Sequence, residues 1–440
     1  MSDSLPAVIL GGGVTGLAAG LASGFPVLER EAFPGGICSS YYMRAGSARR
    51  ESAAEAGGDG YRFEHGGGHW IFGGHPDVLS LIGELAPCER FVRRSAVYFP
   101  DEHRFVGFPI QHHLYQLESD VARAALSEIR ASQGSDDAPT MSAWLEARFG
   151  PTLCERFFAP FHAAYTAGLW RTIAPQDGYK TPVDLAQVER GAAGPTNHAA
   201  GYNVTFAYPR EGLDALMHRL AARVDWRAMH AVERIDVGRR ELALADGRTL
   251  RYGALLSTLP LDRTLALCGL QTDAAPDPCT SVLVLNIGAH RGPRHPQEHW
   301  LYIPRSQSGF HRVGFYGNVA EHFLPRAARG GERATCLYVE RSYVGGTRVA
   351  DDEIARLAAQ TVRELQDWGF IGEVDVVDPT WIDVAYTWSR PGSTWVRDAT
   401  MTLAAHGIRL AGRYARWHFQ GIADSLRDGL LAGHALRMAA

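Results

Sequence analysis

The chain has 440 residues, of which 46% are hydrophobic and 21% charged, and its net charge is -4. This composition is that of a globular protein with two or three structural units, and it excludes a disordered or fibrous chain. The charge offers no basic field for nucleic acid, and no apolar run has the length that a membrane helix needs. The six cysteines are scattered without a CxxC pair, which argues against a zinc site and favours a reducing cytoplasm.

A glycine-rich turn follows the first apolar segment. The stretch AVILGGGVTGLAAG predicts a strand over Ala7–Leu10 and then a helix, with Gly11, Gly13 and Gly16 at the spacing of a dinucleotide-binding turn. Gly11 would allow the tight turn, Gly13 the approach of a pyrophosphate, and Gly16 the contact of helix with strand. The apolar run lacks a positive region before it and ends in glycines, so we expect a strand and not a signal peptide.

A second short strand, FPVLER, ends in an acidic residue. Glu29 lies 18 positions after Gly11 (29 - 11 = 18), near the spacing of the acid that binds ribose hydroxyl groups. An acid there favours the unphosphorylated ribose of FAD or NAD over that of NADP. A βαβ unit without a ligand is the alternative interpretation.

The residues after Glu29 distinguish between FAD and NAD. The pair Gly35-Gly36 resembles the extended fingerprint of the flavoprotein group that includes amine oxidases, protoporphyrinogen oxidase and UDP-galactopyranose mutase, and this resemblance implies FAD. GIRLAGRYARW, which contains Gly412, is similar to the last strand and flavin-facing helix of that group. Residues 230–260 alternate like a β-meander, with LADGRTL as a hairpin turn. The resemblance places this meander at the adenine end and makes Val232 a cofactor contact.

Three structural units are expected from these patterns. Residues 1–75, 203–269 and 379–440 would form a discontinuous α/β domain, a Rossmann-like FAD-binding domain. Residues 76–202 would form a mainly helical substrate domain, because three stretches carry apolar residues at helical spacing. Residues 270–378 would form a mixed domain with an antiparallel sheet, since SVLVLNIGA and ATCLYVERSY accompany the helical DDEIARLAAQTVRELQDWG. Two inserts on one nucleotide domain predict a ligand cleft between them.

The stretch FEHGGGHWIFGGH, from Phe63 to His75, places His69 and Trp70 between two clusters of glycine. A simple glycine-rich hairpin is one interpretation. The stretch also resembles the mobile histidine loop of the mutase, which implies that His69 is catalytic beside the flavin and that Gly68 contacts the cofactor. The flanking glycines would let the loop approach the ring closely and shift with the redox state of the flavin.

Other motifs resemble the eukaryotic type of the mutase. FFAPFHAAYTAGLW is similar to the segment that ends in a substrate-facing tryptophan, here Trp170. YNVTFAYPREG is similar to a motif with a substrate-binding asparagine, here Asn203. HWLYIPRSQSGFHRVGFYGN is similar to the segment that holds uridine diphosphate, which implies substrate binding by Trp300, Tyr302 and Arg312.

The resemblance also assigns Arg413, in GRYARWHFQG, as a second diphosphate arginine, so that Arg312 and Arg413 are both candidate catalytic and substrate-binding residues. A planar guanidinium can grip a diphosphate with paired, charge-assisted hydrogen bonds. Phe419 stands where the mutase has a diphosphate-binding tyrosine, so a hydrogen bond worth about 1 kcal/mol is missing. QGIADSL and AYTWSRPG also depart from the mutase pattern, which leaves the nucleotide and sugar open.

The resemblance therefore implies an FAD-dependent mutase of a small-molecule nucleotide sugar, with no protein partner inferred. In that reaction the N5 of reduced flavin displaces the nucleotide, and the sugar changes between pyranose and furanose without net oxidation. The electron donor that first reduces the flavin would be NAD(P)H. The alternative is a desaturase or amine oxidase-like enzyme in which FAD takes a hydride. Many such amine oxidases use a lysine in the second half of the chain, whereas Lys180 is the only lysine here. A flavin-binding protein without catalysis is a third possibility.

Overall fold

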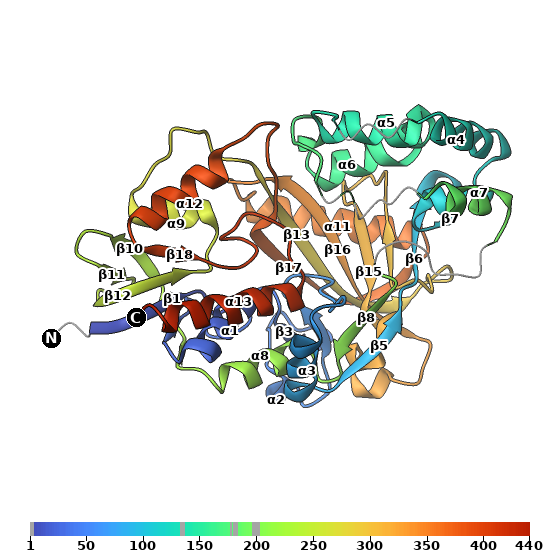
Figure 1. The fold of residues 1–440 in the computed structure, drawn as a ribbon. Coiled ribbons are helices and arrows are strands. Elements are labelled where there is room, and N and C mark those ends of the chain that lie inside the picture. The colour runs from blue at the N-terminus through green and yellow to red at the C-terminus, as the bar shows by residue number, and fades with distance from the viewer. Residues whose placement is uncertain (1–3, 133–136, 177, 179–183, 196–202) are drawn as a thin grey trace.

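The computed structural model describes residues 4–132, 137–176, 178, 184–195 and 203–440. Two of the sheets have seven strands each. Figure 1 shows the first at the end of the molecule near the chain ends and the second in the middle of the molecule. Both chain ends lie beside the first sheet, and the predicted α/β fold is confirmed.

The first sheet joins three separated parts of the chain. Its strand order is β10-β11-β12-β1-β2-β9, and β18 also pairs with β12. β1 pairs in parallel with both β12 and β2, and the predicted LADGRTL hairpin connects β11 to β12. The strands are β1 (Ser4–Leu10), β2 (Val27–Leu28), β9 (Trp226–Arg227), β10 (Val232–Asp236), β11 (Glu241–Leu244), β12 (Thr249–Ser257) and β18 (Ile408–Leu410).

Helices cover both faces of this sheet, which explains why β1 is apolar at every position from Ala7 to Leu10. Val8 and Leu10 pack with α9 (Leu261–Cys268) and α12 (Trp395–Ala405) on one face. Ala7 and Ile9 lie on the other face, in a core that includes residues of α1 (Val14–Ser23) and α13 (Ile422–Arg437). α1 and α13 lie side by side along their length (Figure 1).

The second sheet has the order β17-β13-β16-β15-β14-β6-β7. α11 (Asp351–Asp367), the predicted helix, packs on one face of the sheet. Leu283 and Leu285 of β13 are buried beneath it. The other face meets the hairpin of β3 (Ser40–Met43) and β4 (Tyr61–Glu64). The strands are β6 (Ser95–Phe99), β7 (Arg104–Gly107), β13 (Cys279–Arg291), β14 (Trp300–Tyr302), β15 (Arg312–Phe315), β16 (Ala334–Val344) and β17 (Ile371–Thr387).

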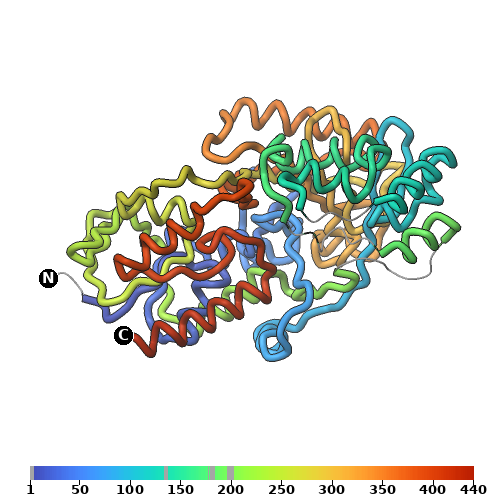
Figure 2. The backbone as a smooth tube through the Cα atoms, turned by 45° about the horizontal axis from the view of Figure 1, so that its top comes forward, coloured from blue at the N-terminus to red at the C-terminus, as the bar shows by residue number. Residues whose placement is uncertain are grey.

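The predicted helices of the region after residue 76 are confirmed, and most of them form the teal layer at the end of the molecule away from the chain ends (Figure 2). The helices are α3 (Pro76–Leu85), α4 (Ser119–Ala131), α5 (Met141–Leu153), a π-helix (Cys154–Phe158), α6 (Ala159–Tyr165) and α7 (Leu185–Ala193). Shorter or separate helices elsewhere are α2 (Ala53–Ala56), α8 (Leu213–Ala221) and α10 (Tyr316–Val319).

The structure differs from the expected helical region between α3 and α4. β5 (Cys88–Val92) pairs with β8 (Thr205–Pro209), while β6 and β7 join the second sheet. These short strands are rich in aromatic and β-branched residues. β5 and β6 each have a pairing partner far away in the sequence, where helical spacing gives no information, whereas β7 pairs with the neighbouring β6. The division into three units stays a prediction. The second sheet takes β6 and β7 from the predicted helical unit, and β17 crosses the predicted boundary at residue 378.

Among the described residues, no helix has both the length and the apolar character needed to cross a membrane.

The close packing of α1 on α13 generates a test of stability. A Cβ added at Gly429 of α13 would lie 2.2 Å from the Thr15 carbonyl oxygen of α1. We expect Gly429→Ala to lower the free energy of unfolding by about 1–3 kcal/mol, because the helices would have to separate. Gly83 of α3 is the matched control, since a Cβ there meets nothing within 4 Å. Gly83→Ala should raise the free energy of unfolding by about 0.5–1 kcal/mol in the same urea titration. Equal changes in the two variants would contradict this account of the packing.

Candidate active site

A cavity of about 1020 Å³ extends from the end of β1 to the helical region. Its wall contains most of the residues predicted from the sequence: Gly11, Gly13, Glu29, Gly35, Gly36, Gly68, His69, Asn203, Val232, Trp300, Tyr302, Arg312, Arg413 and Phe419. Three predicted residues that the structure describes lie outside the wall, namely Gly16, Gly412 and Trp170.

The nucleotide turn connects β1 to α1 at one end of the cavity. Gly11 has a φ of +98°, a conformation that glycine adopts without strain. A Cβ added at Gly16 would lie 1.8 Å from the Gly11 carbonyl oxygen, so the helix approaches the turn as closely as a glycine permits. Gly16 thus lies behind the wall and determines how the turn packs.

Gly13 is the N-cap of α1 and faces open space, because a Cβ added there meets nothing within 4 Å. The first turn of α1 contains no acidic side chain, and Gly13 has no side chain that could accept hydrogen bonds from the first N–H groups of the helix. The N–H groups at this helix start are therefore free to bind an anion, and the helix dipole favours negative charge there.

Glu29 lies at the end of β2 with only 9% of its surface exposed. Its Oε2 accepts a hydrogen bond from the Gly12 N–H at 2.6 Å, and its Oε1 accepts one from the Glu31 N–H at 2.9 Å. These bonds hold the carboxylate in the cavity wall, and its remaining lone pairs can accept hydrogen bonds from ribose hydroxyl groups.

The pair Gly35-Gly36 closes the other side of the turn. The Gly35 N–H donates to the Gly12 carbonyl at 2.8 Å, and both glycines have positive φ, +100° and +57°. Gly412 has a φ of +91°, and its N–H donates to Asp428 of α13 at 2.7 Å. Gly412 therefore connects β18 to the two packed helices without facing the cavity.

The glycine loop Glu64–His69 contributes His65, Gly66, Gly68 and His69 to the cavity wall. A Cβ added at Gly68 would lie 1.9 Å from the Tyr338 hydroxyl, and one at Gly67 would lie 3.1 Å from Glu340 Oε1. The loop therefore rests directly on β16, a contact that was not predicted from the sequence. This close approach, and not turn formation alone, requires glycine at position 68.

His69 leaves this loop with its ring in the cavity wall, and Nδ1 lies 3.4 Å from the Gly67 carbonyl oxygen. Burial, and after it the positive charge of Arg413, lower the pKa of His69 to about 4. The imidazole is therefore neutral at pH 7. It can donate or accept a hydrogen bond there but does not contribute a charge.

Arg312 pairs with a carboxylate that the sequence analysis missed. Its guanidinium donates to Glu340, which is 2% exposed, and to the Tyr386 hydroxyl at 3.2 Å. Burial opposes the ionisation of Glu340, but Arg312 and the nearby His311, whose Nε2 lies 3.6 Å from Glu340 Oε2, lower the pKa of Glu340 to about 2. Part of the Arg312 charge is therefore neutralised inside the protein.

Arg413 has different surroundings. One of its terminal nitrogens donates to the Ala385 carbonyl at 2.8 Å, and the guanidinium lies 4.6 Å from the Phe419 ring centroid and 5.4 Å from that of Tyr386. It forms no ion pair with any residue that the structure describes, and its buried Nε has no hydrogen-bond partner among them. Arg413 is thus a cavity cation that can receive an anionic ligand.

Aromatic side chains make up the end of the cavity near the helical region. Tyr302 lies 4.2 Å from the Phe108 ring and 5.6 Å from Phe161, measured between ring centroids. Trp300 is buried beside Tyr302 in β14, and its indole N–H has no partner among the described residues. Asn203 enters the wall with a φ of +54°, an uncommon conformation for a residue other than glycine. These rings can stack on a flat ligand group.

The structure places Trp170 outside the cavity wall. Its ring is 7% exposed and belongs to the buried core of the helical region, 6.3 Å from the His162 ring. Its segment is a short 3-10 helix, Leu169–Arg171, that turns the ring inward. Tyr165 and Trp388 line the cavity in its place, and their rings lie 5.4 Å apart.

The sequence contained a weak signal for two residues that were not predicted, Tyr338 and Glu340. Tyr338 and Glu340 alternate with apolar residues in ATCLYVERSY, which indicates that they share one face of the strand. Their importance depends on Arg312 and the glycine loop, which come from distant parts of the chain. Lys180 lies outside the described residues.

Comparisons with known proteins place the chain in a family. Residues 19–436 match the family described as flavin containing amine oxidoreductase, and the chain belongs to it. The protein is therefore a flavin-dependent enzyme of this family. The residues present fit that cofactor, since Gly13 leaves open space at a helix start and Glu29 is held beside it.

Solved structures share the fold. A reduced UDP-galactopyranose mutase is 19% identical with a TM-score of 0.83, and the match covers 99% of this chain and 96% of the other. A putative protoporphyrinogen oxidase from Exiguobacterium sp. 255-15 is 16% identical with a TM-score of 0.67, over 100% of both chains. A putrescine oxidase bound to putrescine is 14% identical with a TM-score of 0.58, over 99% of both. These low identities show the fold and leave the reaction open.

The nucleotide turn can be tested at two glycines with different surroundings. Gly13→Ala should reduce the affinity of the apoprotein for FAD at least tenfold, about 1.4 kcal/mol, because the methyl group enters the space open to the ligand. The same change should alter the free energy of unfolding of the apoprotein by less than about 1 kcal/mol.

Gly16→Ala is the comparison, since its methyl group meets the Gly11 carbonyl and should lower the stability of the apoprotein itself by about 1–3 kcal/mol. FAD titration followed by fluorescence, together with urea unfolding without FAD, separates the two effects. A Gly13→Ala variant that binds FAD as the parent does would contradict the placement of the cofactor.

Proposed function

We propose that the protein is an FAD-dependent nucleotide-sugar mutase that interconverts pyranose and furanose forms without net oxidation. The observation that carries the proposal is that Arg312 and Arg413 both line the cavity near His69, with Arg413 free of any ion pair among the described residues. Two guanidinium groups in a partly apolar cavity suit a diphosphate leaving group.

The residues have separate roles in this proposal. The helix start at Gly13 binds the pyrophosphate of FAD, and Glu29 binds its ribose. When bound and reduced, FAD supplies a nucleophilic nitrogen that can displace a diphosphate from the sugar. NAD(P)H is the proposed source of the electrons that first reduce it.

The protein orients the substrate and stabilises the leaving group. Arg413 and Arg312 bind the diphosphate and stabilise the charge that develops on it as the bond to the sugar breaks. Asn203 can hydrogen-bond sugar hydroxyl groups. We propose that the neutral His69 lies beside the flavin, where it can donate or accept a hydrogen bond. Trp300, Tyr302 and the nearby aromatic wall position the nucleoside and exclude water.

The second candidate is an oxidoreductase that transfers a hydride from an apolar substrate to the flavin. The helical region favours it, because Met141, Phe157, Phe158 and Phe161 give that end of the cavity an apolar wall. The internal pairing of Arg312 with Glu340 also reduces the positive charge available to a phosphate.

Arg413 provides a binding test of the first candidate. Arg413→Ala should weaken the binding of UDP, GDP or dTDP by about 2 kcal/mol or more, because a phosphate charge would lose its partner. The matched control is Arg416→Ala, since Arg416 pairs with Asp428 at 2.9 Å, is 46% exposed and lies outside the cavity wall. Calorimetry would measure both variants against the parent.

Arg312→Ala should weaken binding too, but it leaves the buried Glu340 without its partner and should therefore also destabilise the protein. If Arg413→Ala binds all three nucleoside diphosphates as the parent does, the diphosphate role of this residue is wrong.

The oxidation state in which the enzyme works distinguishes the two candidate reactions. The mutase should act only with reduced flavin and consume no reductant per turnover, because only reduced N5 carries the electron pair needed for displacement. The experiment is to reduce the enzyme anaerobically with dithionite, add a panel of nucleotide sugars, and follow isomer formation and flavin absorbance together.

Many turnovers with the flavin still reduced would support the mutase. Conversion by the oxidised enzyme, with flavin bleaching or peroxide formation in proportion to product, would overturn it and support the oxidoreductase.

A further inference from the structure

One buried polar side chain of the second sheet has no role in binding the cofactor or substrate. Asn286 is 0% exposed and lies in β13 between Leu285 and Ile287, which are buried in the core beneath α11. Burying an amide costs free energy unless its hydrogen bonds are satisfied. The position of Asn286 therefore requires an explanation beyond packing.

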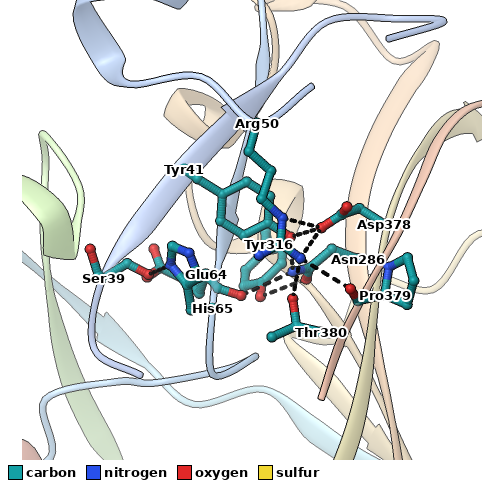
Figure 3. A network of polar contacts seen from close by, with 10 residues as sticks. All are labelled: Ser39, Tyr41, Arg50, Glu64, His65, Asn286, Tyr316, Asp378, Pro379 and Thr380. Atoms are coloured by element: carbon teal, nitrogen blue, oxygen red, sulfur yellow. Dashed lines mark hydrogen bonds and ion pairs between the residues drawn. The ribbon is translucent and has the colours of Figure 1, made fainter. Parts of the chain in front are cut away.

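The amide of Asn286 uses both of its donors toward the β3–β4 hairpin. Nδ2 donates to the Glu64 carbonyl at 2.9 Å and to the Tyr41 hydroxyl at 2.9 Å. Oδ1 accepts from the Tyr316 hydroxyl at 3.2 Å. Figure 3 shows Asn286 between these groups. Its hydrogen bonds are directional, so they define where the Glu64 carbonyl lies.

The network continues to the surface. Tyr41 donates to Asp378, and Arg50 donates to the same carboxylate at 3.0 Å and to Thr380 at 2.7 Å (Figure 3). The Arg50 guanidinium also lies 4.4 Å from the Tyr41 ring centroid. Tyr41 is therefore held from both sides, which makes the hydroxyl that Asn286 contacts a fixed partner.

The strand register places Asn286 directly beside the support of the glycine loop. In the sheet, Asn286 of β13 lies opposite Tyr338 of β16 on one side and opposite Asp378 of β17 on the other. Tyr338 contacts the loop at Gly68, and its neighbour Asn286 binds the loop at Glu64. Two adjacent residues of the sheet therefore hold the loop at two points. The Glu64 carbonyl also accepts from the Gly67 N–H at 3.3 Å. His69 is the next residue after these two points.

We infer that Asn286 is a positioning residue that anchors the base of the glycine loop and thereby sets the approach of His69 to the flavin. Asn286 contacts neither the cavity nor His69, so its effect must pass through the loop backbone. The inference rests on the proposed placement of His69 beside the flavin.

The first test measures the loop itself. In the FAD-bound protein, Asn286→Ser should increase amide hydrogen exchange at Gly66 and Gly67 at least tenfold, because serine is too short to reach the Glu64 carbonyl. Leu285→Ala is the matched control for general destabilisation of β13, since Leu285 faces α11, and it should change these rates less than twofold. Asn286→Ala replaces the serine variant if that variant does not fold. Equal rates in the Asn286 and Leu285 variants would overturn the inference.

The second test asks whether the effect passes through His69. His69→Ala should shift the ratio of reduced to oxidised flavin at fixed potential at least threefold. Asn286→Ser should shift it in the same direction, and it should add no further shift in the His69→Ala background. A further shift in that background would overturn the inference, because Asn286 would then act on the flavin by another route.

The two failures are distinguishable. If His69→Ala leaves the flavin ratio unchanged, the proposed placement of His69 beside the flavin is wrong, and so is the final step of the inference. Anchoring of the loop by Asn286 would then be supported or rejected by the exchange rates alone.

Discussion

The close contact between the glycine loop and β16 is the constraint on which the site depends. At Gly68 the backbone approaches the Tyr338 hydroxyl so closely that a Cβ would lie 1.9 Å from it. This contact joins the hairpin of the nucleotide-binding part to the second sheet. It therefore relates the flavin end of the cavity, which depends on the turn after β1, to the substrate end, which depends on β14 and β15.

The same contact brings charges together in a place from which water is largely excluded. Glu340 lies two residues from Tyr338 on the same face of β16 and pairs with Arg312 of β15. A buried charge without a partner would be costly, so the ion pair keeps Arg312 charged and oriented before any ligand arrives. A diphosphate would compete with Glu340 for Arg312, whereas at Arg413 it would meet no such competitor among the described residues. Arg413 therefore offers the stronger net attraction.

Much of the cofactor end could be predicted because its requirements are local. Gly11, Gly13, Gly16 and Glu29 lie within one βαβ unit, where spacing along the chain determines spacing in the structure. Long helices were also predictable, since apolar residues repeat within each of them. Strand β5 was missed because its partner β8 lies far away in the sequence, and β6 because it joins the second sheet through the distant β14. β7 pairs with the neighbouring β6, and this local hairpin was also missed.

The substrate end was less predictable for the same reason. The sequence identified Arg312 as a charged residue that could bind phosphate, but it did not show that Glu340, 28 positions away, would pair with it. Trp170 looked like a binding residue because of its motif, yet the turn at its segment directs the ring into the helical core. Asn286 stood in an apolar stretch, and its function depends on a carbonyl 222 positions earlier.

Phe419 departs from the mutase pattern, which has a tyrosine at this position, and its surroundings give the difference a physical meaning. Its ring lies 4.6 Å from the Arg413 guanidinium, so it stabilises that cation through its π face where a tyrosine would also offer a hydroxyl to the ligand. The hydrocarbon ring limits water around Arg413 and leaves the hydrogen-bonding of any bound phosphate to the guanidinium. In the proposed function, recognition of a phosphate at this position would therefore depend on charge more than on a hydroxyl donor.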